Sequence, residues 1–199
     1  MKKLSRLIAL LGLMLGILPA EAQDAANRNR FTNHTEVGAL FGKVEYATNP
    51  YGNPVTYGRQ TKTNLSMQTF NGLYVAPKLA AGLTLGLDWY NEAIINPVAL
   101  GARYDLLARY NARIFATVDA GYGFTWFNKD LNQNNLIGGW MINPGIGWRL
   151  GRPGTGGFTI ALTYKRQEAT LKMPLDRAIL KQEESRIYNR LGVRVGIVF

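Results

Sequence analysis

Cysteine is absent from the 199-residue sequence. The chain therefore forms no disulfide, and no thiolate is available to bind a metal ion. Histidine is nearly absent too, because His34 is the only one. Catalytic arrangements that place histidine beside serine or aspartate thus have a single candidate here. Stability must come from the packed core, or from lipid around it.

Long apolar runs are also scarce. The longest covers residues 7–18, which is short of the ~20 residues that a membrane-spanning helix needs. It follows a basic start and precedes Ala20-Glu21-Ala22. This pattern predicts a signal peptide over residues 1–22, with an uncleaved anchor as the alternative, and a periplasmic segment over 23–34. If the remaining chain lies in a membrane it must be a closed β-barrel, because lipid leaves an open sheet edge unpaired.

Acidic residues are few relative to basic ones. The chain has 23 lysines and arginines against 13 acidic residues, a formal net charge of +10. Such a balance suits an anionic surface, either lipopolysaccharide or nucleic acid. The basic residues do not cluster, and the export signal argues against nucleic acid. We therefore expect outer-membrane lipid and lipopolysaccharide as partners, and no nucleic acid.

Alternation of apolar and polar residues fills the rest of the chain and predicts strands. Eight segments show it: 35–46, 64–75, 81–90, 98–107, 113–127, 138–150, 158–168 and 186–199. Two are irregular. Pro144 suggests a bulge, and Thr69 and Asn71 lie on the apolar side of their segment, which a bulge or a change of face near Phe70 would explain.

The connections between these segments indicate how the strands are arranged. No odd-numbered connection is shorter than its even-numbered neighbours, a rhythm typical of up-and-down membrane barrels with short periplasmic turns. We predict an all-β fold, an eight-stranded antiparallel up-and-down transmembrane β-barrel over residues 35–199. Its loops would be extracellular and both termini periplasmic.

The two faces of the strands differ in a way that indicates which one meets lipid. The apolar face carries all four tryptophans, whereas the other consists of glycine, threonine, alanine, asparagine and charges of both signs. A soluble barrel would place large apolar residues inside and charges outside. The expected membrane-interface aromatics, near strand ends, are Trp89, Trp126, Trp140, Trp148 and Phe199. Ordinary core packing of these aromatics, or a soluble lipid-binding barrel, is the alternative.

The last strand carries a family resemblance. Leu191, Val193, Val195, Ile197 and Phe199 alternate with polar or small residues. This pattern resembles the C-terminal signal of Gram-negative outer-membrane β-barrels, and "PVALGARYDLL", "FATVDAGYGF" and "INPGIGWRL" are similar to strands of small barrels from Bacteroidetes-type bacteria. The whole mature chain is most similar to the OmpA-like or OmpX-like class. The resemblance implies recognition by the barrel-assembly machinery and closure of the final strand against the first. Because the predicted barrel fills the chain to residue 199, we expect no peptidoglycan anchoring of the OmpA type.

Charged residues on the polar face form the candidate site. Opposite charges in a narrow interior should pair, because an isolated buried charge is costly. Arg103 with Asp119 is the first expected pair and Asp88 with Arg103 the second. We interpret the lumen as plugged, with ion pairs that fix register; a polar relay or gated pore is the alternative. The expected lumen residues are Asp88, Arg103, Asp105, Asp119, Arg149, Lys165, Arg190 and Arg194.

Other segments favour no chemistry. His34, placed just before the first strand, is expected to have a structural or solvent role, and Gly151–Gly157 reads as a turn rather than a phosphate cradle. Residues 48–60 are a candidate loop for a glycan or surface partner, and 172–186 a solvated segment. We expect no cofactor, no metal and no catalysis, in a monomer with a structural, adhesive or surface-interaction role. The alternatives are a narrow porin or transporter of small solutes or hydrophobic molecules, and a lipid-modifying enzyme using His34.

Overall fold

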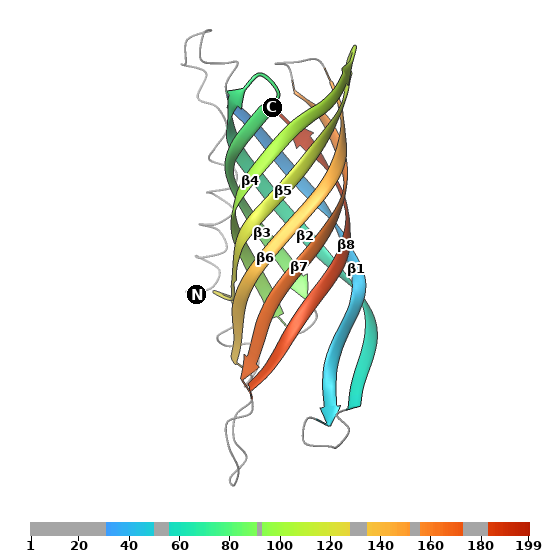
Figure 1. Cartoon of the computed structure of the whole chain (residues 1–199), viewed down its shortest axis with the longest axis vertical. Helices are drawn as coiled ribbons and strands as arrows, with labels where there is room; N and C mark the ends of the chain where they lie inside the picture. Colours follow the sequence, from blue (N-terminus) through green and yellow to red (C-terminus); the bar gives the residue numbers. More distant parts are fainter. Residues whose placement is uncertain (1–30, 50–55, 91–92, 128–134, 152–155, 173–182) are drawn as a thin grey trace.

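Eight strands form one closed sheet in the computed structural model, which describes residues 31–49, 56–90, 93–127, 135–151, 156–172 and 183–199. Each strand pairs antiparallel with its sequence neighbours, and β1 pairs with β8 to close the barrel (Figure 1). The all-β prediction is confirmed. The described residues include no helix long and apolar enough to cross a membrane. The strands are β1 (Phe31–Asn49), β2 (Thr56–Ala76), β3 (Leu79–Tyr90), β4 (Ala93–Arg109), β5 (Ala112–Phe124), β6 (Asn135–Leu150), β7 (Gly157–Lys172) and β8 (Glu183–Val198).

The barrel has two different ends. At one end β1 begins, Phe199 follows β8, and the connections cover residues 77–78, 110–111 and 151–156. We call this end the terminal rim. The connections at the other end cover 50–55, 91–92, 125–134 and 173–182, and we call it the loop rim. β1 starts at Phe31, so residues 31–34 belong to the barrel and not to the expected periplasmic segment; the expected signal peptide lies outside the described residues.

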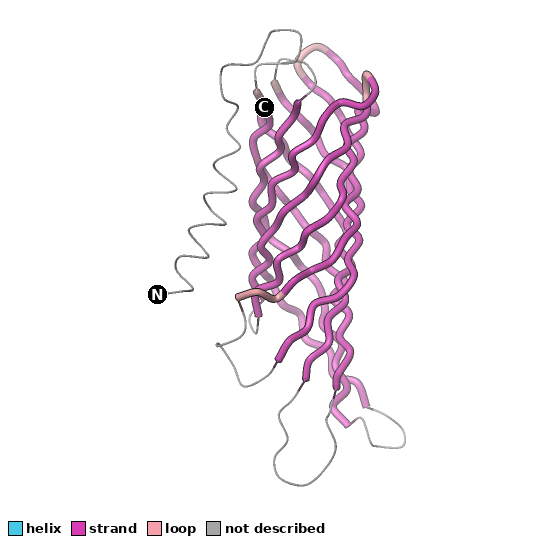
Figure 2. Tube along the Cα trace, turned by 90° about the vertical axis from the view of Figure 1, so that its left-hand side faces the viewer, coloured by secondary structure: helices cyan, strands magenta, loops and turns pink. Residues whose placement is uncertain are grey.

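β1 and β2 extend past their neighbours at the loop rim. They pair with each other from Phe31↔Leu73 to Asn49↔Thr56. Pairing of β1 with β8 reaches only Val44, and pairing of β2 with β3 reaches only Leu65. The outer part of this hairpin is therefore a two-stranded ribbon that projects beyond the closed wall (Figures 1 and 2).

The alternation places charges inside the barrel and large apolar side chains outside. Leu100 is 75% exposed and Phe158 69% exposed, whereas Asp119 and Arg194 are at most 1% exposed. This is the reverse of a soluble barrel, whose outer surface is polar. The predicted assignment of the two faces is confirmed for the described strands.

The irregular β2 segment contains no change of face near Phe70. Pairing with β1 continues unbroken through Thr35↔Thr69 and Asn33↔Asn71. These four side chains lie on the outer face, where they bond to one another: Asn33 donates to Thr69 (3.0 Å) and Asn71 (2.6 Å), and Thr35 bonds to Asn33 (2.9 Å) and Thr69 (3.1 Å). The expected face switch was wrong because mutual hydrogen bonding satisfies polar groups that would otherwise face the wrong way.

The expected bulge at Pro144 is also wrong, because β6 bulges earlier, between Gly138 and Met141. Pro144 itself keeps its place opposite Val118 of β5. The carbonyl of Gly138, at the bulge, accepts a 2.6 Å hydrogen bond from the Tyr122 hydroxyl on β5. The bulge is thus held from the neighbouring strand.

Glycines make room for the long charged side chains along the β1–β8 seam. Gly38 lies opposite Arg194, and Gly196 lies opposite Glu36. A Cβ on Gly38 would be 2.7 Å from Arg194 Cγ and 2.1 Å from the Val193 carbonyl oxygen. A Cβ on Gly196 would be 2.8 Å from Glu36 Cγ. Each charged side chain therefore crosses the seam over a residue that has no side chain of its own.

Gly38→Val tests this packing. Its side chain would collide with the backbone of β8, so we expect the folded barrel to lose stability by at least the ~1–3 kcal/mol typical of overpacking. The matched control is Ala39→Val, which adds the same side chain on the outer face one residue along and should change stability little. Urea unfolding of both variants in detergent micelles is the measurement. Equal stability of the two variants would show that the seam has room.

Candidate functional site

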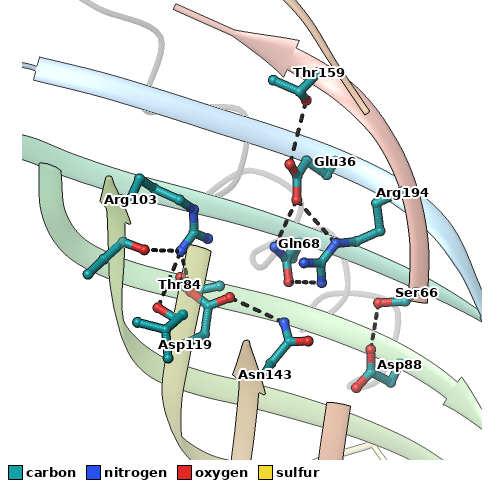
Figure 3. A network of polar contacts seen from close by, with 12 residues as sticks. Glu36, Ser66, Gln68, Thr84, Asp88, Arg103, Asp119, Asn143, Thr159 and Arg194 are labelled. Carbon is teal, nitrogen blue, oxygen red and sulfur yellow. Dashed lines mark hydrogen bonds and ion pairs between the residues drawn. The ribbon is translucent and has the colours of Figure 1, made fainter. Parts of the chain in front are cut away.

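The interior polar residues belong to two networks, each confined to half of the barrel. The first joins β3 to β6 around Asp119 (Figure 3). Asp119 forms an ion pair with Arg103 on β4 at 2.8 Å, the pair expected first from the sequence. It also accepts hydrogen bonds from Thr84 on β3 (2.6 Å) and Asn143 on β6 (3.2 Å). One carboxylate thus ties four strands together, and we call these residues the β3–β6 network.

The second network joins β7, β8, β1 and β2 around Glu36 (Figure 3). Glu36 pairs with Arg194 Nε at 3.2 Å and accepts a 2.9 Å hydrogen bond from Gln68 and a 3.5 Å one from Thr159. Arg194 also donates to Gln68 Oε1 at 2.8 Å. These side chains are all buried. We call them the β7–β2 network; together the two networks involve all eight strands.

Among the described residues, two polar side-chain contacts reach across the lumen between the halves. Lys165 on β7 pairs with Asp88 on β3, whose other oxygen accepts a 2.7 Å hydrogen bond from Ser66 on β2. Nearer the terminal rim, Arg149 on β6 donates to the Tyr74 hydroxyl on β2 at 3.2 Å. Both contacts tie walls that share no backbone pairing.

The expected pairing of Asp88 with Arg103 is wrong. Both side chains point inward, on adjacent strands, but the register sets Arg103 opposite Ala80 and Asp88 opposite Ile95. Eight residues of β3 separate these positions, about 26 Å at ~3.3 Å per residue. Asp88 therefore pairs with Lys165 instead.

The terminal rim of the lumen holds a carboxylate between two arginines. Asp105 pairs with Arg113 at 2.7 Å and with Arg149 at 3.1 Å. The side chain of Arg113 is 24% exposed and that of Arg149 12%, so this cluster is more open to solvent than the two networks. Asp105 and Arg149 were expected in the lumen, and the structure brings them together.

His34 lies inside the barrel wall rather than ahead of the first strand. Its ring packs edge-on against Phe70 (5.8 Å between centroids) and Phe115 (5.6 Å). The Arg103 guanidinium lies 4.3 Å from the Phe70 ring centroid. The Nδ1 atom of His34 has no hydrogen-bond partner. It therefore makes no hydrogen bond to a serine or aspartate of the kind that the lipid-modifying enzyme alternative requires. The surroundings are those of a packing residue.

Arg190 and an apolar cluster occupy the loop-rim side of the lumen. The cluster consists of buried residues from several strands: Leu40, Tyr90, Ile95, Leu136, Ala169 and Tyr188. Arg190 is 1% exposed. Its guanidinium lies beside the contacting Tyr90 and Tyr188 rings, 5.8 Å from the Tyr90 centroid and 5.7 Å from the Tyr188 centroid. All eight expected lumen residues thus point into the barrel.

Sequence reasoning missed Glu36 and Arg113. Glu36 is the second residue of the predicted strand 35–46, and Arg113 is the first residue of the predicted strand 113–127. The polar face is hard to recognise at such strand ends. The signal was nevertheless present, since Glu36 alternates with Val37 and Arg113 has the parity of Thr117 and Asp119. Extending the alternation to the first residues of each strand would have found them.

The arrangement can fix the barrel's shape, because buried side chains occupy the lumen at every level. Among the largest fully buried side chains are Phe70, Phe115, Lys165, Arg190 and Arg194. An eight-stranded barrel has an interior that side chains can fill. Within the described strands, no group of three or more acidic or histidine side chains has the placement of a metal site.

The aromatic residues expected at membrane interfaces lie on the outer wall. Trp126, Trp140, Trp148 and Phe199 are exposed, and Trp89 is half-buried. The Trp126 ring stacks on that of Phe124, with 4.7 Å between centroids, and the Tyr122 and Trp140 ring centroids are 6.1 Å apart. The loop-rim side of β5 and β6 therefore has an aromatic patch. Trp148 and Phe199 lie toward the terminal rim.

Comparisons with known proteins agree on the fold. No protein-family model matches the chain, and no curated protein matches it. The outer membrane protein OprG from Pseudomonas aeruginosa matches with a TM-score of 0.57 at 10% identity, over 85% of this chain and 94% of OprG. The outer membrane protein AlkL, solved in lipid bilayers, matches with a TM-score of 0.52 at 11% identity, over 91% of this chain and 94% of AlkL. The fold is that of small outer-membrane β-barrels, which is the class that the sequence resembles.

Asp119→Ala should strongly destabilise the barrel. It leaves the Arg103 guanidinium buried without its counter-charge, and breaking such a pair costs about 3–5 kcal/mol. The control is Glu168→Ala, which removes a half-exposed partner of Arg166 at 3.8 Å and should cost at most about 1 kcal/mol. Urea unfolding in micelles measures both. A loss below about 1 kcal/mol for Asp119→Ala would contradict a role of this pair in holding the four strands.

Proposed function

We propose that this chain is an integral outer-membrane protein with a closed lumen, no catalytic role, and a structural or surface-interaction function. The observation that carries the proposal is the arrangement of its two faces. Charged side chains such as Asp119 and Arg194 are buried inside, and large apolar ones such as Leu100 and Phe158 are exposed outside. Exposing such an apolar surface to water is unfavourable, whereas exposing it to lipid is favourable.

The two ends support one orientation in that membrane. Short connections are typical of the periplasmic end of bacterial barrels and long ones of the outer surface. The terminal rim is then periplasmic, and the loop rim and the β1–β2 ribbon lie outside the cell. Trp148 and Phe199 would lie near the inner interface, and Trp89, Trp126 and Trp140 near the outer one. The basic chain would contact lipopolysaccharide, and β8 would present the strand pattern read by the barrel-assembly machinery.

The lumen contents favour this function over that of a porin. A water-filled pore needs a continuous opening, but paired charges occupy the middle of this barrel and an apolar cluster occupies its loop-rim side. Removing these side chains from the axis would break buried ion pairs, which is costly. We therefore expect partners to bind at the outer surface. We also expect the protein to be a monomer.

Single-cysteine labelling tests the placement, because the chain has no native cysteine. Thr56→Cys introduces a thiol where β2 begins at the loop rim, and Lys78→Cys introduces one in a turn at the terminal rim. A membrane-impermeant maleimide should label only Thr56→Cys on intact cells. Both variants should react once the outer membrane is permeabilised. Labelling of Lys78→Cys alone on intact cells would show that the orientation is the reverse. Recovery of the protein in the soluble fraction without detergent would contradict membrane insertion.

Planar-bilayer recording tests the closed lumen. The purified barrel should insert without producing conductance steps, because buried side chains fill its axis. A known water-filled porin in the same bilayer is the positive control, and heat-denatured protein is the negative one. Regular steps of one size would instead support the narrow-porin alternative.

A further inference from the structure

Arg190 differs from the other deeply buried cations of the lumen. Arg103, Lys165 and Arg194 each pair with a carboxylate. Among the described residues no carboxylate lies within ion-pair distance of Arg190, although its side chain is only 1% exposed. An uncompensated buried cation is expensive, so its retention calls for a compensating group.

The contacts of Arg190 satisfy only one of its nitrogens. Nη1 donates to the backbone carbonyls of Gly42 (2.7 Å) and Lys62 (3.0 Å), which anchors the guanidinium against β1 and β2. Nε and Nη2 are buried and have no hydrogen-bond partner. The hydroxyl of Tyr90, whose ring lies beside the guanidinium, is also buried without a partner. The free groups of this arginine and of that phenol are all able to donate.

Arg190 lies toward the loop-rim end of the lumen. Tyr90 is the last residue of β3, and β4 begins again at Ala93, so the wall ends at the level of this arginine on that side. Glycine at position 42 keeps the neighbouring strand clear, since a Cβ there would lie 3.0 Å from Arg190 Cδ. Arg190 therefore lies at the loop-rim mouth of the lumen rather than at its centre.

We propose that Arg190 and Tyr90 form a binding site for a compact anion, either a carboxylate group or a small inorganic anion, at the loop-rim mouth. Arg190 Nε and Nη2 supply charge-assisted hydrogen bonds, and the Tyr90 hydroxyl supplies a third donor. The apolar residues around the pair, Leu40 and Ile95 among them, exclude water and so strengthen the attraction. Ordered water bound to the unpartnered Nε and Nη2 of Arg190 is the competing occupant.

Nuclear magnetic resonance on the whole labelled barrel in zwitterionic micelles tests the site directly. The Nε–Hε signal of Arg190, assigned by its loss in Arg190→Gln, should shift and saturate as sodium acetate or sodium chloride is added. We expect a dissociation constant on the order of 1–10 mM for the preferred anion, the strength of a small site. Saturation by acetate alone identifies a carboxylate site, and saturation by chloride identifies an inorganic-anion site. The exposed Arg166 signal is the internal control, and it should move only linearly with salt.

Thermal unfolding provides a second readout with matched variants. The preferred anion should raise the unfolding temperature of the wild-type barrel and of Arg166→Gln, which removes the same charge from the outer wall. It should not raise that of Arg190→Gln, and in Tyr90→Phe the dissociation constant should rise several-fold. If neither anion moves the Arg190 signal more than that of Arg166, or if Arg190→Gln keeps the full response, water is the occupant and the proposal is overturned. None of these outcomes depends on which membrane holds the protein.

Discussion

The narrow interior of an eight-stranded barrel is the constraint on which the rest of this structure depends. Charged side chains placed there have little water around them, so a charge without a partner of opposite sign is costly. Asp119 and Glu36 meet this need for two sets of strands, and Lys165 and Asp88 connect the sets. Glycines such as Gly38 and Gly196 follow from the same constraint, because a long side chain crosses the seam only where its neighbour has none.

Filling the interior with polar groups determines what the outer wall must be. Apart from the interior cluster around Leu40 and Ile95 and the buried Phe70 and Phe115, most large apolar residues of the strands lie on the outside of the barrel. In the proposed membrane placement, lipid would cover these apolar side chains. In such a molecule the lumen acts as a scaffold, and other molecules would bind at the rims. The terminal rim has two partly buried arginines around Asp105, and the loop rim has Arg190, whose Nε and Nη2 have no hydrogen-bond partner.

Much of this architecture follows from alternation in the sequence, and the failures have physical causes. The number of strands and the identity of the two faces can be predicted from the alternation alone. The Arg103–Asp119 pair can be predicted from the alternation and the fact that β4 and β5 are neighbours. The Asp88–Arg103 pair failed because the stagger between β3 and β4 comes from closure of the whole sheet, which no local pattern records. Likewise, the start of β1 depends on pairing with Leu73 of β2, far away in the chain. Arg190 is buried inside the barrel, but its lack of a carboxylate partner among the described residues is visible only once all eight strands are assembled.

The hydrogen-bonded group on the outer face of β1 and β2 has a consequence for how this wall can change in evolution. Asn33 donates to both Thr69 and Asn71, and Thr35 joins Asn33 to Thr69. Replacing any one with an aliphatic residue leaves polar atoms of the others without a hydrogen-bond partner, whereas replacing all of them together leaves none unpaired. Sequences with only some of these residues replaced lose stability, whereas sequences with all four polar or all four aliphatic residues do not. These positions should therefore be inherited as a block, with drift at one held back by the other three.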